Sequence, residues 1–565
     1  MKDSIITPSK TRFLMATLML SASTLTFSAN FDLLNQPQTN FGGIEQNAPL
    51  KGETWNTPSI LESMQQEKIK EKKKDYLEIL NLFKQNKLNE GEKKLAALFK
   101  QYPEDPELFN LQALADSLKK DIASAEKNYQ KAIAKDKNNI LAHLGLSKLA
   151  LDGGDLTKAQ DYANKTLTIN PKIVNAHLLL ADVAYKQKNT SQVESILSNA
   201  LKQVAGNIAQ EIEVIQNLGK FYAIQKQPEK ILALGEDLSK RYPGDNQALS
   251  LLAGAQIVNN KKAEAEQTLV EIIKHDKQDV NHRLLLAKLL SDSTEKEKEV
   301  IKLLDEALTI APENPQVLVF KTAYQIKLKH YPEALELANL AEKKFPAGSI
   351  GALLKGDVYL AEKKPDEALK NYQQAYKKQP NDKVLFTIAD LLVAQKKTPE
   401  AMKLLENELA KNSKNNAVHF KLASLYQQQN DYQQAEKHYN AMLADQPDNA
   451  LALNNLAWIY SQQNNPKAAE LAEKAFSKAP ESAAIADTYG FILLKQEPAK
   501  GLEILEKAAA LAPQANDIQY HLAAAYNAND QKTKAIEILE RILKSENYFA
   551  EKNAAAELLK QLKQD

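Results

Sequence analysis

Beyond residue 70, large apolar, small and polar residues recur at fixed positions within a repeat of about 34 residues. Prolines mark this period most clearly. Their successive gaps are 33 or 34 residues, or between 67 and 72 where one is skipped, at Pro103, Pro171, Pro243, Pro312, Pro346, Pro380, Pro447, Pro480 and Pro513. A period of this length indicates supersecondary elements, each of which buries its apolar face only against its neighbours. The sequence therefore predicts one long repeat array rather than several separate domains.

One repeat shows the pattern in full. Counted from Ser349 as place 1, small residues stand at places 8, 20 and 27, tyrosines at 11 and 24 and proline at 32: Gly356, Tyr359, Ala368, Tyr372, Ala375 and Pro380. This pattern resembles the tetratricopeptide repeat (TPR), a hairpin of two antiparallel helices, A and B. Places 8 and 20 are expected to face each other where helices A and B cross, and place 27 to meet the next helix A. The proline is expected to end helix B.

Counting with this period gives about 14 repeats over residues 72–549, which begin near residues 72, 106, 140, 174, 212, 246, 280, 315, 349, 383, 416, 450, 483 and 516. The predicted fold is an all-α, right-handed superhelical α-solenoid of about 14 TPR hairpins. Residues 548–565 are predicted to form one more amphipathic helix, which caps the array. Extra residues around Gly206 to Glu211 are assigned to the repeat from 174, and the charged segment Thr294 to Glu299 lies within the repeat from 280.

Residues 1–28 have the three-part pattern of a secretory signal peptide. Lys2, Lys10 and Arg12 precede a mostly apolar run over residues 13–27, and the small Ser28 follows. This run is shorter than the roughly 20 residues that span a bilayer, so cleavage after Ser28 is preferred over a retained anchor. Residues 29–70 are rich in Asn, Gln, Pro, Gly and Thr and are predicted to form a flexible linker. The protein is thus expected to be exported, with membrane contact only peripherally or through an uncleaved N-terminal segment.

The composition excludes several classes of chemistry. The 565 residues are 44% hydrophobic and 26% charged, and they include no cysteine. Disulfides, thiolate metal sites, cysteine nucleophiles and a lipid-modified N-terminal cysteine are therefore ruled out. With 73 basic and 72 acidic residues the net charge is +1, and only four basic residues are arginines. This balance creates no overall field for a polyanion, so no nucleic-acid partner is expected.

The sequence also lacks the common catalytic motifs. It has no glycine-rich phosphate loop, no His-Glu-x-x-His and no Gly-x-Ser-x-Gly. Of the eight histidines only His275 and His282 lie close together, across a loop between repeats that also contains Asp276 and Asp279. These residues are the best metal candidate, but solvated polar side chains are the simpler interpretation. We predict that the protein is not an enzyme and has no catalytic residue, metal or cofactor.

A superhelical array of this kind can act by binding, because its inner surface is an extended groove built from helix-A side chains. In the TPR family these side chains stand mostly at places 2, 5, 9, 12 and 13. In the last repeats such places hold aromatic, amide and acidic residues that we predict to bind a partner: Phe420, Asn454, Trp458, Asp487, Phe491, Tyr520 and Asn527. Rings beside amides or carboxylates suit either sugar rings or an extended peptide, so both ligands remain open. The alternative is that Trp458 and Phe491 merely pack between adjacent helices.

The C-terminal repeats carry a closer resemblance over about the last 100 residues. Leu-Asn-Asn-Leu-Ala-Trp at 453–458, Asp-Thr-Tyr-Gly-Phe at 487–491 and Ala-Ala-Ala-Leu-Ala-Pro at 508–513 are similar to bacterial TPR proteins from exopolysaccharide loci, in particular the exosortase-associated TPR family. The resemblance implies a periplasmic, non-catalytic scaffold for exopolysaccharide assembly or secretion, which binds protein partners of that complex or the polymer itself. The alternatives are a periplasmic adaptor for outer-membrane or pilus biogenesis and a regulatory repeat subunit of an envelope enzyme complex.

Overall fold

The computed structural model describes residues 73–545 and 549–564, so the predicted signal peptide (1–28) and most of the region before the array lie outside it. The described residues form 29 α-helices and one short 3-10 helix and contain no β-strand. The predicted fold class, an all-α solenoid of TPR-like helix hairpins, is confirmed. None of the helices in this part of the chain is both long and apolar enough to cross a membrane.

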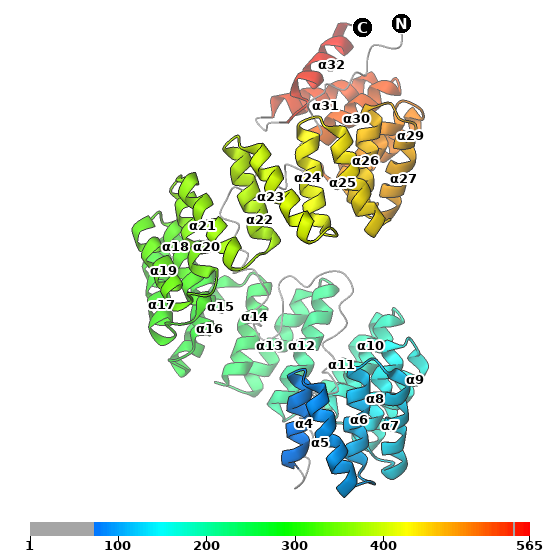
Figure 1. Cartoon of the computed structure of the whole chain (residues 1–565), viewed down its shortest axis with the longest axis vertical. Helices are drawn as coiled ribbons and strands as arrows, with labels where there is room; N and C mark the ends of the chain where they lie inside the picture. Colours follow the sequence, from blue (N-terminus) through cyan, green and yellow to red (C-terminus); the bar gives the residue numbers. More distant parts are fainter. Residues whose placement is uncertain (1–72, 546–548, 565) are drawn as a thin grey trace. The chain divides into compact units, whose positions relative to one another are not determined.

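The chain divides between Pro312 and Glu313 into two compact units. The described part of the N-terminal unit contains seven antiparallel hairpins, stacked in chain order (Figure 1). Their helix pairs are α4 (Lys73–Lys84) with α5 (Leu88–Gln101), α6 (Pro106–Leu118) with α7 (Ile122–Lys135), α8 (Ile140–Asp152) with α9 (Leu156–Ile169), α10 (Val174–Lys186) with α11 (Thr190–Gln203), α12 (Ile208–Ile224) with α13 (Pro228–Arg241), α14 (Asn246–Val258) with α15 (Lys262–His275) and α16 (Val280–Leu290) with α17 (Glu297–Ile310). The 3-10 helix η1 (Thr294–Lys296) lies between α16 and α17.

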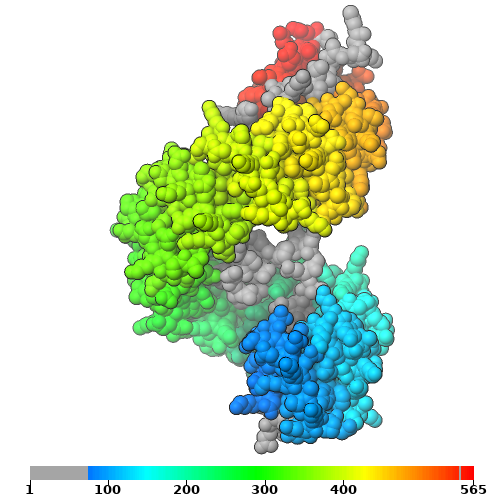
Figure 2. Space-filling view, viewed as in Figure 1, coloured from blue at the N-terminus to red at the C-terminus, as the bar shows by residue number. Residues whose placement is uncertain are grey.

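The C-terminal unit contains seven further hairpins and one final helix. Its helix pairs are α18 (Pro315–Lys327) with α19 (Tyr331–Lys344), α20 (Ile350–Ala361) with α21 (Pro365–Lys378), α22 (Asp382–Ala394) with α23 (Thr398–Lys411), α24 (Asn416–Gln428) with α25 (Tyr432–Asp445), α26 (Ala450–Gln462) with α27 (Lys467–Lys478), α28 (Ala483–Leu493) with α29 (Pro498–Leu511) and α30 (Asn516–Ala528) with α31 (Lys532–Lys544). The final helix α32 (Lys552–Gln564) packs on α31 through Ala555, Leu558 and Leu562. Neighbouring hairpins within the unit form a continuous surface (Figure 2).

Twelve of the fourteen described hairpins turn from helix A to helix B through one residue in the left-handed conformation, with φ between 52° and 83°. The next residue then donates its backbone N–H back into helix A, as Asp121 does to the Asp116 carbonyl at 2.9 Å. This bond closes the helix as in a Schellman motif. The left-handed residues are Asn86, Lys120, Gly154, Lys188, Lys226, Asn260, Lys329, Lys363, Lys396, Asn430, Asn464 and Asp530.

The connections between hairpins follow from proline and from capping residues. Helix B ends two residues before a proline in nine hairpins, as in α21, which ends at Lys378 before Pro380. Proline disfavours the helical conformation of the residue before it, which explains this end point. The next helix A often begins after an Asp or Asn whose side chain accepts a backbone N–H, as Asn139 does from Ala142 at 2.8 Å. Such caps satisfy N–H groups that the first helical turn leaves open.

Small residues let each helix A approach the preceding helix B. A methyl group added at Gly351 would lie 2.5 Å from the Cα atom of Glu342, so the backbones of α20 and α19 touch at this point. The predicted contact of place 8 with place 20 is observed, since the Ser147 hydroxyl at place 8 of the repeat from 140 donates to the carbonyl oxygen of Ala159 at place 20, at 2.7 Å. Place 8 also contacts place 24. A methyl group at Gly356 would lie 2.7 Å from the ring of Tyr372, so place 8 holds the tyrosine of place 24. Ala375 at place 27 is fully buried.

Tyrosines of helix A form hydrogen bonds to glutamates of the preceding helix B. The Tyr460 hydroxyl of α26 donates to Glu436 of α25 at 2.7 Å, and the Tyr526 hydroxyl of α30 donates to Glu506 of α29 at 2.7 Å. The same contact joins α12 to α11 and α24 to α23. Burial, together with the neighbouring carboxylate, raises the pKa of Tyr460 and of Tyr526 to about 12. These hydroxyls therefore stay protonated and act as donors between hairpins.

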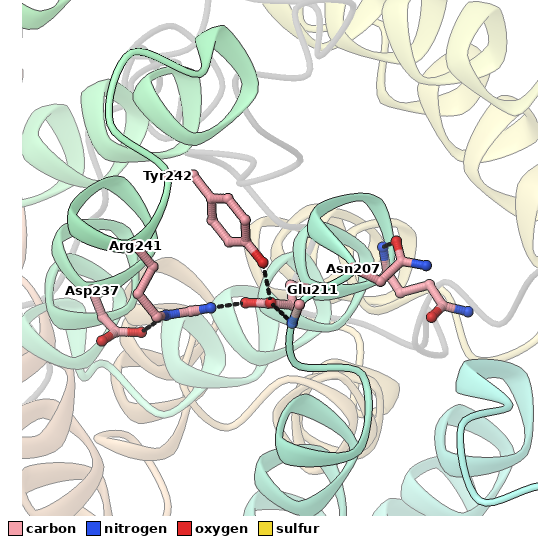
Figure 3. Close-up of polar contacts among 7 residues, drawn as sticks. Asn207, Glu211, Asp237, Arg241 and Tyr242 are labelled. Carbon is pink, nitrogen blue, oxygen red and sulfur yellow. Dashed lines mark hydrogen bonds and ion pairs between the residues drawn. The ribbon is translucent and has the colours of Figure 1, made fainter.

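The region of the extra residues folds around Glu211. Helix α12 begins at Ile208 rather than near residue 212, so most of these residues lengthen the next helix A instead of the repeat from 174. Glu211 is fully buried. Its Oε1 accepts the backbone N–H of Gly206 at 2.8 Å and the hydroxyl of Tyr242 at 2.7 Å. Its other oxygen pairs with the Arg241 guanidinium, which also contacts Asp237 at 2.9 Å (Figure 3).

Replacing Glu211 by alanine is expected to destabilise the N-terminal unit by about 3 kcal/mol, because the Arg241 guanidinium and the Tyr242 hydroxyl lose a buried acceptor. Asp237→Ala is the matched control, since Asp237 binds the same arginine but its side chain is 63% exposed. Exposed pairs contribute about 1 kcal/mol or less. Urea unfolding followed by circular dichroism measures both variants. Equal losses would contradict the role assigned to Glu211.

Candidate functional site

The predicted binding residues lie on four helices A of the C-terminal unit, α24, α26, α28 and α30. Helix α28 contacts both α26 and α30, so the helices A of the last hairpins are neighbours. The structure leaves some of the residues at their surface and buries others. The exposed and half-buried ones, together with the exposed Leu451 of α26, are called the helix-A row, which consists of Phe420, Leu451, Trp458, Phe491, Tyr520 and Asn527.

Phe420 and Trp458 are half-buried, and each ring packs against a tyrosine of α25. The Phe420 ring meets Tyr439 edge to face with centroids 6.1 Å apart, and Trp458 meets Tyr432 in the same way at 5.8 Å. One side of each ring is thus fixed by the hairpin while part of the ring stays accessible. Packing between helices and contact with a partner are therefore compatible at these two positions.

Leu451 of α26 is the member of the row that the sequence analysis missed. Its side chain is 56% exposed, the largest value among the exposed large hydrophobic residues of the described chain. Leu451 and Trp458 are seven residues apart, two helical turns, and so share one face of α26. Leu451 stands at place 2, one of the binding places of the TPR family, and this position was the signal that could have identified it.

Asn454 does not belong to the exposed surface. It is only 4% exposed, and its amide donates to the side-chain oxygen of Asn455 at 3.3 Å. Asn455 in turn donates to the Tyr439 hydroxyl at 3.1 Å, and that hydroxyl donates to Gln427 at 3.1 Å. This chain of hydrogen bonds crosses from α26 through α25 to α24. The geometry gives Asn454 a role in joining helices.

Asp487 is likewise engaged inside the protein. It is 6% exposed, and its two carboxylate oxygens lie 2.8 and 2.9 Å from Nδ1 of His521. The Phe491 ring lies against the same histidine, with ring centroids 4.3 Å apart. The Tyr520 ring also contacts this histidine, with ring centroids 5.6 Å apart. The sequence analysis brought Asp487 and Phe491 together but missed His521. Asp487 and His521 are 34 residues apart, one full repeat, which is the signal that places them on neighbouring helices A.

Burial lowers the pKa of His521, but the charge and hydrogen bond of Asp487 outweigh burial and, with Glu551 and Asp517, raise it to about 9. His521 is therefore an imidazolium at neutral pH and pairs with the Asp487 carboxylate. Burial raises the pKa of Glu551, just before α32, to about 8, and its hydrogen bond to Asp517 adds to the shift. This cluster fixes the Phe491 ring and connects α28, α30 and the segment that leads into α32.

A second buried histidine pair has the opposite electrostatics. Nδ1 of His419 in α24 lies 2.9 Å from Nδ1 of His438 in α25, so one ring donates and the other accepts. The Tyr426 ring stacks on His438 with centroids 5.6 Å apart. Burial, with the charge of His419 adding to it, lowers the pKa of His438 to about 4. The pair is therefore stable only while His438 is neutral.

The candidate metal residues have other partners. Nδ1 of His282 lies 2.5 Å from Oδ2 of Asp279, and its Nε2 lies 2.6 Å from the Ser250 hydroxyl. His275 contacts Asn246 at 3.2 Å. Over the described residues no group of three or more His, Cys, Asp or Glu side chains is arranged to hold a metal ion.

Comparison with known proteins identifies the class of repeat. Residues 324–383 match one tetratricopeptide repeat family, and residues 359–425, 392–459 and 426–481 match another. Residues 324–481 are thus tetratricopeptide repeats, which generally form non-catalytic scaffolds that bind other proteins. No curated protein matches the sequence. The resemblance to the exosortase-associated family stays a prediction.

Three solved structures show a distant similarity to the chain. The APC/C hetero-tetramer Cut9–Hcn1 shares 15% identity and covers 82% of this chain and 98% of that chain, with a TM-score of 0.34. Yeast Tom70 shares 16% identity over 82% of this chain and 96% of that chain, with a TM-score of 0.32. Naa15/Naa10 bound to HypK-THB shares 16% identity over 86% of this chain and 79% of that chain, with a TM-score of 0.30.

The two histidine pairs predict opposite pH dependences. A histidine whose pKa is about 9 when folded, against 6.5 when unfolded, stabilises the protein fully below pH 6.5, and this contribution of about 3 kcal/mol is lost as the pH rises to 9. A histidine whose pKa is about 4 when folded stabilises the protein above pH 6.5, and this contribution is lost as the pH falls to 4.

The melting temperature of His521→Asn is therefore expected to fall less than that of the wild type between pH 6.5 and 9. The melting temperature of His438→Asn is expected to fall less than that of the wild type as the pH decreases from 6.5 to 4. Each variant is the control for the other, and Glu551→Gln separates the contribution of the carboxyl group beside His521. Calorimetry of the full chain across this range measures the melting temperatures. An alkaline slope unchanged in His521→Asn would show that the Asp487 pair contributes no net stability.

Proposed function

We propose that this protein is a non-catalytic repeat scaffold that binds an extended segment of a partner protein along the helix-A row. The observation that carries the proposal is the surface of α24 to α30. Its helices A present a 56% exposed leucine, Leu451, and the half-buried rings of Phe420, Trp458, Phe491 and Tyr520. Aromatic anchors with an adjacent exposed aliphatic side chain are typical of surfaces that bind protein.

The buried polar residues favour a protein segment over a sugar polymer. A bound sugar chain would need hydrogen-bonding groups beside the rings for its hydroxyl groups. The predicted candidates for that task, Asn454 and Asp487, are 4% and 6% exposed and bind Asn455 and His521. The accessible members of the helix-A row other than Asn527 are aromatic or aliphatic, which suits the apolar side chains of an extended peptide. Tetratricopeptide repeats in general bind proteins, in agreement with this choice.

The cellular setting of the proposal rests on the two ends of the chain. The charged start and apolar run of residues 1–28 support export, and the resemblance of the last repeats supports a role in the bacterial envelope. We infer that the protein acts in the periplasm and that its partner belongs to an exopolysaccharide assembly or secretion complex. An adaptor for outer-membrane or pilus biogenesis would use the same surface, and the identity of the partner distinguishes the two.

Photo-cross-linking tests the binding surface. A benzoylphenylalanine residue placed at Leu451 is expected to give a discrete protein adduct in the native host, because a bound segment would cover this position. The same residue at Leu118 is the matched control, since Leu118 is also an exposed leucine, at 46%, but lies on α6. Leu451→Ser and Trp458→Ala are expected to abolish the adduct of a probe at Phe420. Their melting temperatures should stay close to that of the wild type.

Three outcomes would contradict the binding proposal. Identical adducts from positions 451 and 118 would show unspecific contact. A glycan adduct at position 451 would show that this surface binds the polymer and not a protein. A large fall in melting temperature for Trp458→Ala, corresponding to a loss of about 3–5 kcal/mol in the free energy of unfolding, would show that this ring belongs to the core.

The cleavage of the N-terminal segment is tested separately. Mass spectrometry of the protein purified from its native host is expected to find a mature chain that begins at Ala29, because small residues stand at the two positions that signal peptidases recognise, Thr26 and Ser28. Fractionation should find this form outside the cytoplasm. A chain that retains residues 1–28 in the cytoplasmic fraction would contradict the export proposal without touching the binding proposal.

A further inference from the structure

We propose that the N-terminal unit holds a binding site for a phosphate ester, in a pocket lined by α17 and the start of α16. The pocket is open to solvent and has a volume of about 520 Å³. Lys298, Ile301 and Lys302 lie on one face of α17, because they are three and four residues apart. The pocket shares no residue with the helix-A row, so the proposal goes beyond the scaffold function.

Arg283 supplies a buried positive charge to this pocket. It is only 5% exposed, in a chain with four arginines. Its Nε donates to Glu306 at 3.2 Å, and its Nη1 donates to the Asp279 carbonyl oxygen at 2.6 Å. A guanidinium has five N–H groups, so three of them have no acceptor among the described residues. Because Arg283 lines the pocket, these groups can meet a ligand there.

Lysines provide the remaining positive charges. Lys298 and Lys277, which precedes α16, line the pocket and form no ion pair with any residue in the described ranges. Lys302 lies 3.9 Å from Glu306 and is thus only loosely paired. Asp305 and Glu306 also line the pocket. Four positive and two negative side chains leave a net charge of +2 at the pocket.

A phosphate monoester matches this arrangement better than other anions. Its charge of about −1.5 to −2 at neutral pH balances the two excess positive charges, whereas a carboxylate or a sulfate ester would balance one. The planar guanidinium can bind two oxygens of a phosphate at once. Ile301 and Ile310 line the same pocket and offer an apolar surface for the organic part of an ester. The inferred ligand is therefore a phosphorylated organic molecule.

Isothermal titration of the full-length protein with phenyl phosphate, phenyl sulfate and inorganic phosphate tests this site. Phenyl phosphate is expected to bind about tenfold more tightly than phenyl sulfate, which has the same shape and one charge fewer. It should also bind more tightly than inorganic phosphate, which lacks the apolar part. Lys298→Gln is expected to weaken phenyl phosphate binding about tenfold, the loss of one charge-assisted hydrogen bond.

Two further variants complete the experiment. Arg283→Lys keeps the charge but removes the fork of N–H groups, so it should weaken the binding of phenyl phosphate without abolishing it. Lys370→Gln removes one exposed lysine of α21, outside the pocket, and should change nothing. If Arg283→Lys fails to fold, Lys298→Gln still decides, because Lys298 is exposed.

The proposal is overturned by any of four results: no binding of phenyl phosphate, equal affinity for phosphate and sulfate esters, tighter binding of inorganic phosphate than of the ester, or equal losses in Lys298→Gln and Lys370→Gln.

Discussion

The structure depends on how closely each helix A approaches the helix B before it. At Gly351 the distance leaves no room for a side chain, since an added methyl group would meet the backbone of Glu342. Gly145 makes the equivalent approach to the Tyr129 ring of α7. These contacts involve only neighbouring hairpins, so the array has no single central core. Its stability is approximately the sum of hairpin and nearest-neighbour contributions, as in other repeat proteins.

Close approach between helices also decides which residues remain for binding. Polar side chains that lie between packed helices are desolvated and must find partners there. Glu211 binds Arg241 and Tyr242, Asn454 binds Asn455, and Asp487 binds His521. A side chain one turn nearer the start of helix A can escape this constraint, as Leu451 does relative to Asn454. The surface available to a partner is therefore more apolar than the sequence pattern suggests.

The hairpins could be predicted because their determinants are local. Proline two residues beyond helix B and a left-handed residue such as Asn430 or Lys363 at the turn act within a few residues of chain. Side-chain partners could not be predicted in the same way, because they depend on the distance between helices. Yet Asp487 and His521 are 34 residues apart, and Ser250 and His282 are 32 apart, each close to one repeat. Searching for chemical pairs at the repeat length would have found both.

The three described arginines show why residue type matters in an array rich in lysine. Arg241 and Arg283 each bind a glutamate from a neighbouring helix, and Arg541 binds Gln519. Lysines instead form ion pairs at the surface, where their flexible side chains keep the ammonium group hydrated and each pair contributes little stability. The rigid fork of N–H groups in arginine suits buried positions, because it keeps its hydrogen bonds in a fixed direction where water is excluded. At Arg241 the fork is held by two carboxylates, whereas at Arg283 it is shared between one carboxylate, one carbonyl and an open pocket. The same side chain therefore serves as a structural tie in one hairpin and leaves binding capacity in another.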